Sequence, residues 1–378
     1  MHIFINALSA RLGGGQTYLL NLLKHVPQED NWQVIVLVQP SFALDDLPQN
    51  VLRLEQASLE NPLKRAVWEE TCLPSLLRQH DIKLFFSPGG LLPRSLPTNM
   101  LTAVTFQNML PFDHEQRNKY PLGYRRLRDW LLERGLSSSM RRSDLVIFIS
   151  EFARNFINHE LGELKGANVV IPHGIDSSFI ASSEYLLPRP VWLPKEDYFL
   201  YVSFIDHYKA QLEVVQGFYL YRQQGGQGRL ILAGSEYRPY ADLVRQKITD
   251  LSLNNEVIMT GNIPHADLPA LYQNARINLF ASFTENCPNI LLEMMASGRP
   301  ALVSNRAPMN EFGVDTVAYF DPSNPEDLAR HLIALNFDED RQLRLGSDAM
   351  NRAALHTWEV AAGNTWKALE KTGQKLSN

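Results

Sequence analysis

The chain has 378 residues, enough for two domains of about 150 to 200 residues that each bury a core of their own. Its hydrophobic content of 45%, charged content of 20% and net charge of −5 are typical of a globular protein, and we expect no nucleic-acid partner. Two cysteines far apart in sequence, Cys72 and Cys287, favour neither a disulfide framework nor a metal site. No basic leader and no run of ~18 apolar residues is present, so we expect a cytoplasmic protein, with peripheral membrane attachment left open.

The first half of the chain alternates apolar runs with helical segments, which predicts an α/β domain built on a parallel sheet. The expected strands are residues 2–7, 33–38, 83–86, 101–105 and 144–149. The first is followed by Leu12-Gly-Gly-Gly-Gln16 and an amphipathic helix, a geometry in which backbone can closely approach a phosphate. A plain surface loop is the alternative, because the spacing fits neither the dinucleotide fingerprint nor a P-loop.

The window 117–142 combines basic residues with a helical apolar stripe. Tyr120, Tyr124, Leu127 and Leu131 fall at helical spacing, with Trp130 beside them. The basic residues are Arg117, Lys119, Arg125, Arg126, Arg128, Arg134, Arg141 and Arg142, against two acidic ones. This pattern fits a helix that lies in the headgroup region of an anionic membrane, and it predicts peripheral membrane contact through residues 117–142. The alternative is a helix whose stripe packs on its own sheet and whose arginines are solvated.

A second α/β half is expected after a proline-rich linker. Three prolines lie in residues 185–194, and they suit a semi-rigid connection. Strands are predicted at residues 198–203, 229–234, 256–261, 277–281 and 301–304. A last helix is expected near residues 358–370. Asp338-Glu-Asp340 has the spacing of a metal-binding acidic string, but it lies in a polar helical segment and is interpreted as solvated charge.

The stretch 283–300 is a loop running into a short helix. Asn286 is a candidate N-cap, Pro288 suits the first turn, Gly298 supplies a left-handed stop and Pro300 prevents continuation. Since a strand precedes it, the helix should begin at the carboxyl end of a parallel sheet, where free amides and the helix dipole attract anions.

Two carboxylates frame this helix, Glu285 and Glu293. If helix covers most of the interval, they stand roughly 12 Å apart. That exceeds the separation of about 5 to 9.5 Å that glycosidase acids need, so they more plausibly hold different parts of one extended ligand. Two solvated glutamates on a buried helix are the alternative.

The run from Glu285 to Pro300 resembles the signature of the retaining GT-B glycosyltransferases of family 4: a Glu, seven residues, a second Glu, then Gly-x-Pro. The resemblance implies two Rossmann-like, doubly wound parallel-sheet domains that face a cleft. Their expected ranges are 1–184 for the acceptor domain, 185–196 for the linker, 197–355 for the nucleotide-sugar domain and 356–378 for a helix crossing back. It implies a metal-independent hexosyltransferase without a cofactor, which transfers sugar from a nucleotide sugar to a glycan or lipid-linked acceptor in surface polysaccharide assembly.

The resemblance also assigns site residues. Lys209 and Glu285 are the candidate catalytic residues, with Lys209 on the leaving diphosphate and Glu285 on the donor sugar. Glu293 is expected to hold the ribose. The remaining donor-side candidates are Gly14, Gly15, Thr260, Gly261, Asn286, Cys287, Pro288 and Asn289.

The chain departs from the family pattern at two places. Gln107 and Asn108 stand where many relatives carry a His-Asp pair, so amides replace the expected imidazole on the acceptor side. Ser203 and Phe204 stand where a glycine and an arginine are expected, so one of two cations is missing; His207 or a residue of the first domain is the candidate replacement. These departures keep open a catalytically silent sugar-binding subunit, and the scaffold keeps open an epimerase or a phosphorylase.

Overall fold

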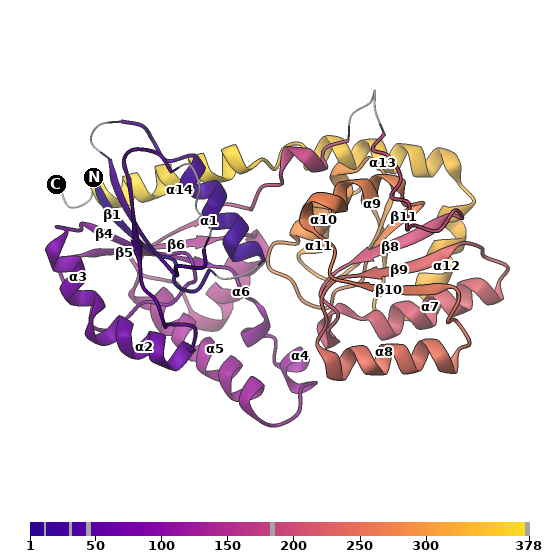
Figure 1. Ribbon diagram of the computed structural model, residues 1–378, viewed down its shortest axis with the longest axis horizontal. Helices are drawn as coiled ribbons and strands as arrows, with labels where there is room; N and C mark the ends of the chain where they lie inside the picture. The colour runs from indigo at the N-terminus through magenta and orange to yellow at the C-terminus, as the bar shows by residue number, and fades with distance from the viewer. Residues whose placement is uncertain (11–12, 30–31, 43–46, 182–185, 375–378) are drawn as a thin grey trace. The chain divides into compact units, whose positions relative to one another are not determined.

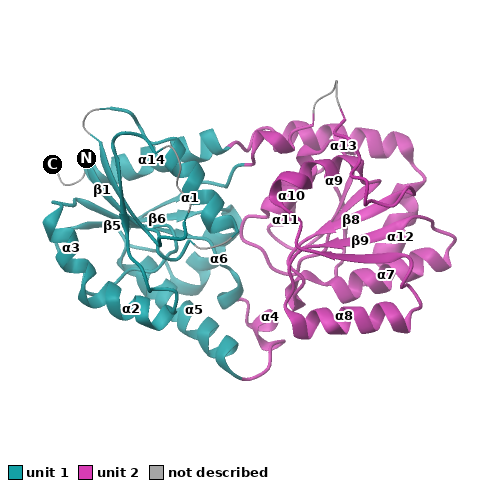
Figure 2. Ribbon diagram, in the orientation of Figure 1, with its two compact units in different colours: residues 1–112, 123–174, 358–378 teal, residues 113–122, 175–357 magenta. Residues whose placement is uncertain are grey.

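The computed structural model describes residues 1–10, 13–29, 32–42, 47–181 and 186–374 (Figure 1). The predicted loop residue Leu12 and the first predicted linker residue, Tyr185, lie outside these ranges. The chain divides by its contacts into two compact units (Figure 2). Unit 1 comprises residues 1–112, 123–174 and 358–378, and unit 2 comprises residues 113–122 and 175–357.

Unit 1 is built on a seven-stranded parallel sheet with strand order β3-β2-β1-β4-β5-β6-β7. Its strands are β1 (His2–Asn6), β2 (Gln33–Val38), β3 (Val51–Glu55), β4 (Leu84–Ser87), β5 (Leu101–Phe106), β6 (Leu145–Phe148) and β7 (Ala167–Val170). Its helices are α1 (Gly14–Lys24), α2 (Pro62–Thr71), α3 (Leu73–Gln79), η1 (Leu110–Phe112), α5 (Tyr124–Arg142), α6 (Glu151–Leu161) and α14 (Trp358–Gly373).

Side chains of the unit 1 strands alternate between two cores, one on each face of the sheet. In β1, Ile3 and Ile5 join a cluster with α1 and α14, whereas Phe4 joins a second cluster with α3, α5 and α6. Trp366 of α14 fixes the first cluster, because its indole Nε1 donates to the carbonyl of Leu22 in α1 at 3.0 Å. The near-continuous apolar strands predicted from the sequence therefore reflect burial on both faces.

Unit 2 has a six-stranded parallel sheet with strand order β10-β9-β8-β11-β12-β13. Its strands are β8 (Tyr198–Val202), β9 (Arg229–Ala233), β10 (Val257–Gly261), β11 (Ile277–Phe280), β12 (Ala301–Ser304) and β13 (Ala318–Phe320). Its helices are α4 (His114–Asn118), η2 (Ser177–Phe179), η3 (His207–Lys209), α7 (Gln211–Gln223), α8 (Arg238–Asp250), η4 (His265–Asp267), α9 (Leu268–Asn274), α10 (Asn289–Ala296), α11 (Met309–Gly313), α12 (Pro325–Asn336) and α13 (Glu339–Ala353).

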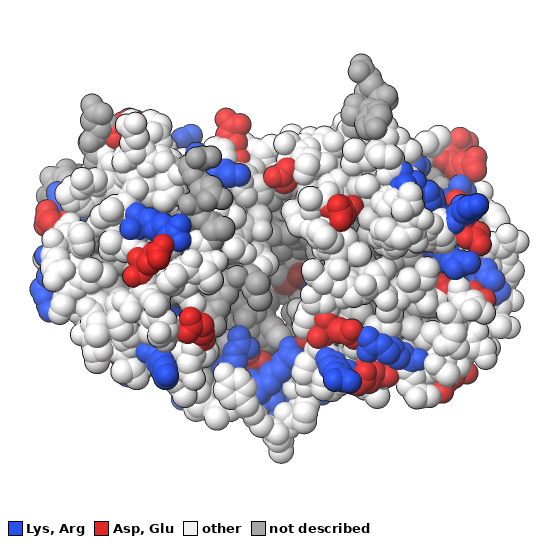
Figure 3. Space-filling model, in the orientation of Figure 1, with Lys and Arg blue, Asp and Glu red and all other residues white. Residues whose placement is uncertain are grey.

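Both sheets are doubly wound, and this confirms the predicted fold class. In Figure 1, α7, α8 and α12 lie along one side of the unit 2 sheet, while α10 and α13 pack together on the other. Acidic and basic side chains are mixed over the face shown in Figure 3. Among the described residues, no helix combines the length and the apolar character needed to cross a membrane.

Candidate functional site

The site in unit 2 lies where its strand order reverses direction. β8 pairs with β9 on one side and with β11 on the other, so the loops that leave β8 and β11 diverge and open a crevice at the carboxyl ends of the strands. The loop after β8 carries Lys209, and the loop after β11 carries Glu285 and leads into α10. Topology alone therefore brings the predicted catalytic residues to one place.

The loop after β8 is held by buried hydrogen bonds. The Asp206 carboxylate accepts from the backbone N–H of His207 at 2.8 Å and from the Tyr120 hydroxyl at 2.9 Å. The Tyr201 hydroxyl donates to the carbonyl of Lys209 at 2.7 Å. Ala210 then takes a left-handed conformation, with φ of 53°, and turns the chain into α7. The backbone of Lys209 is thus fixed before any ligand binds.

Lys209 and Glu285 form a buried ion pair. The Lys209 Nζ donates to Glu285 Oε1, and Lys209 is only 5% exposed. Burial by itself disfavours the charged ammonium, but Glu285, Tyr208 and Asp206 together outweigh that effect and the pKa of Lys209 is raised. The Nζ also lies 5.1 Å from the ring centroid of Phe280, at the end of β11. Lys209 is therefore a fixed cation at the crevice.

The loop after β11 is tied to the loop after β8. The backbone N–H of Phe283 donates to the carbonyl of Tyr208 at 2.7 Å, and the Ser282 hydroxyl donates to the same carbonyl at 3.3 Å. Two strands that are neighbours in space but distant in sequence thus share one rigid edge.

α10 begins at Asn289, and its N-cap is Pro288. The prediction that Asn286 is the N-cap is wrong, because Asn286 lies in the preceding loop, where it is buried. The chain turns at Cys287, whose carbonyl accepts from the N–H of Asn289 at 2.9 Å, and the helix begins only after this turn. The N-cap residue, Pro288, makes no side-chain hydrogen bond to α10. The amino end of α10 follows the loop at the carboxyl edge of the sheet, where the helix dipole favours an anion.

Glu293 lies on α10, one turn after its start. Its Oε1 lies 3.3 Å from His265 Nε2, and this hydrogen bond raises the pKa of His265. Burial and the nearby Glu293 carboxylate also raise the pKa of Tyr272. Because helix covers only the second half of the interval from Glu285 to Glu293, the premise behind the 12 Å separation is wrong. The two carboxylates instead have different basic partners, Lys209 and His265.

Thr260 and Gly261 end β10 at the same carboxyl edge. Gly261 has a φ of 71°, and its carbonyl accepts from the N–H of Gly234 at 2.8 Å. Gly234 is itself required, since a Cβ there would stand 2.1 Å from the carbonyl oxygen of Ser203. Strands β10, β9 and β8 thus end side by side, and the predicted base-side residues share the edge that carries Lys209.

The remaining predicted residues belong to unit 1. Gly14 and Gly15 open α1, which follows β1 at the point where that sheet also reverses its strand order. No described heavy atom lies within 4 Å of where a Cβ would stand on Gly15. Gln107 and Asn108 follow β5, and Asn108 Oδ1 accepts from the N–H of Leu110 at 3.2 Å. These residues line the carboxyl edge of the unit 1 sheet.

Two sets of residues at the unit 2 site were not predicted. His265 and Phe179 pack beside Glu293, with ring centroids 4.9 Å apart. Tyr120 was grouped with the apolar stripe of the following helix, but it precedes α5, is 2% exposed and donates to Asp206 across 86 residues of sequence. Asp338, part of the acidic string, caps α13 by accepting from the N–H of Arg341 at 3.0 Å.

Comparison with known proteins identifies the family. The model of the glycosyl transferases group 1 matches residues 188–352, and that of glycosyltransferase family 4 matches residues 12–179. The O-antigen chain mannosyltransferase B of Escherichia coli is 23% identical over 360 residues, which cover 92% of this chain and 88% of that protein.

Solved structures share the fold at low identity. A sucrose-phosphate synthase from Thermosynechococcus elongatus has a TM-score of 0.75 and 17% identity, with 98% of each chain covered. HepE from Anabaena, solved with UDP and glucose, has a TM-score of 0.73 and 16% identity, with 98% of this chain and 100% of that chain covered.

Proposed function

Since this chain belongs to the group 1 glycosyltransferases of the GT-B fold, we propose that it is a retaining hexosyltransferase that uses a GDP- or UDP-sugar. The acceptor in this proposal is a glycan or a lipid-linked glycan of surface polysaccharide or lipopolysaccharide biosynthesis. The similarity to an O-antigen mannosyltransferase along most of the chain supports that choice of pathway. The observation that carries the proposal is the buried Lys209–Glu285 pair beside the start of α10.

The donor diphosphate is proposed to bind Lys209 and the amides of the loop that leads into α10, around Asn286 to Asn289. Breaking the glycosidic bond increases negative charge on the diphosphate, so fixed positive groups stabilise the transition state more than the ground state. An ammonium whose pKa is raised stays charged throughout this step. In this proposal the positive charge at the diphosphate comes from side chains and backbone amides of the protein, and the reaction uses no metal and no cofactor. The glycine loop at Gly14 and Gly15 is a second proposed phosphate contact.

The two carboxylates are proposed to hold the two sugars of the donor. Glu293 would accept hydrogen bonds from the ribose hydroxyls, which its position one turn into α10 supports. Glu285 would orient the hydroxyls of the transferred hexose, with its charge already balanced by Lys209. Thr260 and Gly261 would lie beside the base, at the same carboxyl edge.

Retention of configuration is proposed to proceed by attack on the face from which the diphosphate leaves, with a leaving phosphate oxygen as the base. This mechanism needs no basic side chain from the protein. It is compatible with amides at Gln107 and Asn108, which can hydrogen-bond sugar hydroxyls but cannot relay protons.

A thermal-shift screen against UDP-, GDP- and ADP-sugars tests this function first. A ligand at 100 times its dissociation constant adds about 2.7 kcal/mol to the free energy of unfolding. We expect UDP- or GDP-sugars to raise Tm, and NMR of the product to show the anomeric configuration of the donor. Donor binding without turnover for any acceptor would instead favour a silent subunit, and inversion would contradict the proposed mechanism.

The protein is also proposed to act at the inner face of the cell membrane, through α5. Large apolar side chains are exposed in its first turns, from 40% for Trp130 to 71% for Tyr124. The other members of this exposed set are Leu127 and Leu131. The side of α5 that packs inward instead carries Leu136 and Met140. The apolar stripe of residues 124–131 is therefore not used to cover the unit 1 sheet.

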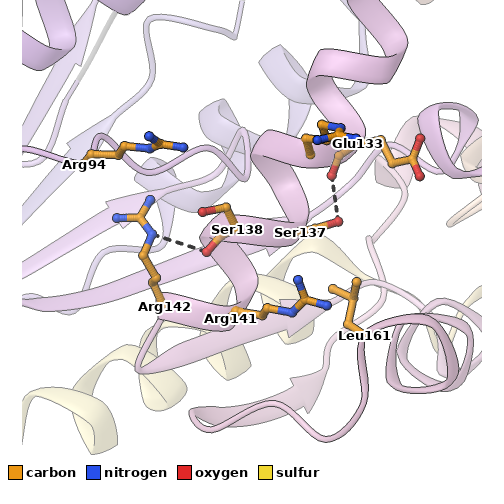
Figure 4. A pocket seen from close by; sticks show the side chains of 8 residues that line it. Arg94, Glu133, Ser137, Ser138, Arg141, Arg142 and Leu161 are labelled. Carbon is orange, nitrogen blue, oxygen red and sulfur yellow. Dashed lines mark hydrogen bonds between the residues drawn. The ribbon is translucent and has the colours of Figure 1, made fainter.

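Arginines continue the α5 surface toward its carboxyl end. A hollow of about 690 Å³ is lined by Arg94, Arg134, Arg141 and Arg142, with Glu133 as its acidic residue (Figure 4). Arg142 also donates to the carbonyl of Leu92 at 2.9 Å, so it is fixed in place. The apolar side chains would contact the acyl boundary of an anionic bilayer, and the arginines would contact its phosphates. Each basic residue near the surface contributes about 1 kcal/mol to the free energy of membrane binding.

Sedimentation with phosphatidylglycerol vesicles tests this surface. We expect binding that weakens with salt and that Leu127→Ser/Leu131→Ser reduces at least tenfold. Leu343→Ser, which removes a leucine of α13 that is more exposed than Leu127 and Leu131, is the control and should bind as wild type. Vesicle binding that the α5 variant leaves unchanged would contradict the proposal.

A further inference from the structure

The positive charge of Lys209 is already balanced within the protein. Its Nζ donates to Glu285, and both side chains are largely buried. A nucleoside diphosphate brings at least two negative charges to this site. The dipole at the amino end of α10 contributes about half a positive charge. A further cation is therefore needed near this pair if the diphosphate is to be held without unbalanced charge.

Lys119 lies against the loop that carries Glu285, although it comes from a distant part of the chain. Its Nζ stands 4.2 Å from the ring centroid of Phe283, two residues before Glu285. Phe283 in turn bonds through its N–H to Tyr208, the neighbour of Lys209. Lys119 itself is exposed, so its ammonium can move from the ring face to a ligand.

The segment that carries Lys119 is anchored to unit 2. The next residue, Tyr120, is buried, and its hydroxyl donates to Asp206 Oδ1 in the loop after β8 at 2.9 Å. The Tyr120 ring also contacts Tyr237 at 5.9 Å between centroids. Tyr120 thus anchors this segment to the loop that carries Lys209, and Lys119 contacts Phe283 in the loop that carries Glu285.

Other side chains near this loop are less suited to the role. The His207 ring is packed against Tyr120 and Tyr240, with centroids 5.2 and 4.5 Å away. Phe204, at the end of β8, is apolar and 41% exposed. Burial raises the pKa of the carboxyl of Glu213, on the first turn of α7, while a backbone hydrogen bond and the charge of Lys119 lower it.

We propose that Lys119 supplies the second positive side chain for the donor diphosphate. The inference rests on the proposed function, because it concerns how the same donor is held. In this arrangement Lys209 is the fixed cation, and Lys119 is an exposed cation that leaves the ring of Phe283 to contact the phosphates.

Calorimetric titration with UDP and GDP tests this role. Lys119→Met keeps the apolar stem that lies on Phe283 and removes the charge, whereas Lys119→Arg keeps the charge. We expect Lys119→Met to weaken binding of the diphosphate that the wild type prefers by about ten- to hundredfold, the loss expected for one charge-assisted hydrogen bond. Lys119→Arg should retain affinity within about threefold. Lys195→Met, which removes another exposed lysine of unit 2, is the matched control and should bind as wild type.

The free nucleoside separates a phosphate contact from a structural effect, because it lacks the diphosphate and should bind Lys119→Met as it binds wild type. Adding Phe204→Arg to Lys119→Met should recover affinity, since it returns a cation to the end of β8. Wild-type affinity in Lys119→Met, or an equal loss in Lys119→Arg, would overturn the inference while leaving the proposed function intact. Failure of the wild type to bind any of UDP, GDP and ADP would instead contradict the proposed function.

Discussion

Lys209→Met separates the chemical role of the buried pair from its structural role. The substitution keeps the length and apolar stem of the side chain and removes its charge. Lys209 and Glu285 have side-chain exposures of 6% and 15%, so water cannot readily replace the lost partner. We therefore expect a loss of turnover and a loss of stability, and the two losses respond differently to a second substitution.

The magnitudes follow from the environment of the pair. One preorganised charge is worth about 2.7–4 kcal/mol in the transition state, so kcat should fall by about 10²–10³. An unpaired buried carboxylate costs about 3–5 kcal/mol. Since Glu285 keeps some exposure, the lower end applies, and about 3 kcal/mol lowers Tm by about 6–12 °C for a domain of this size.

The double variant Lys209→Met/Glu285→Gln is the control, because it removes both charges from the buried site. Its Tm should recover most of the loss, while its kcat stays low because the diphosphate still lacks its cation. Initial rates and scanning calorimetry of the wild type, Lys209→Met and the double variant measure both effects. A single variant with kcat within threefold of wild type would refute the role of Lys209, and a double variant as unstable as the single would refute the buried pair.

Three further results are expected. Glu293→Ala should raise the donor KM about tenfold and change kcat less, because one hydrogen-bonded carboxylate is lost from ribose binding; steady-state kinetics over donor concentration measure this split. The His265 pKa should lie above its ordinary value in an NMR titration, since the hydrogen bond to Glu293 favours the protonated ring, and should fall in Glu293→Gln. The stabilising contribution of this pair is therefore full below about pH 6.5 and lost as pH rises through the folded-state pKa. Gly298→Ala should cost about 1–2 kcal/mol of unfolding free energy, because its φ of 69° is left-handed while the new Cβ meets Met350 and Ala181 only at ordinary distances; denaturant titration measures the loss.

Most of the fold could be predicted from the apolar runs that mark the buried strands. The apolar run of residues 33–38 coincides with β2, and Gly298 ends its helix region with the predicted positive φ. Both features depend on the residue types within a few positions of each other, so they can be predicted from the sequence. The strands β3 and β13 were not predicted, because β3 is only partly buried and β13 has three residues, so neither shows a long apolar run.

The site was predictable only in part, because its pairings are long-range. Lys209 and Glu285 were both named from a family resemblance, yet no spacing rule joins residues 76 positions apart. Tyr120 fits a helical stripe by sequence, but its hydroxyl is needed by the buried carboxylate of Asp206. Asn286 is a good N-cap by residue type, and the turn at Cys287 delays the helix past it. The first two cases depend on tertiary contacts, and the third depends on a local turn that residue type alone does not specify.

The most direct test of the account is a crystal structure with bound UDP or GDP. The account predicts the pyrophosphate against Lys209 and the first amides of α10, with the ribose hydroxyls on Glu293. A nucleotide bound away from the carboxyl ends of β8 and β11 would contradict it.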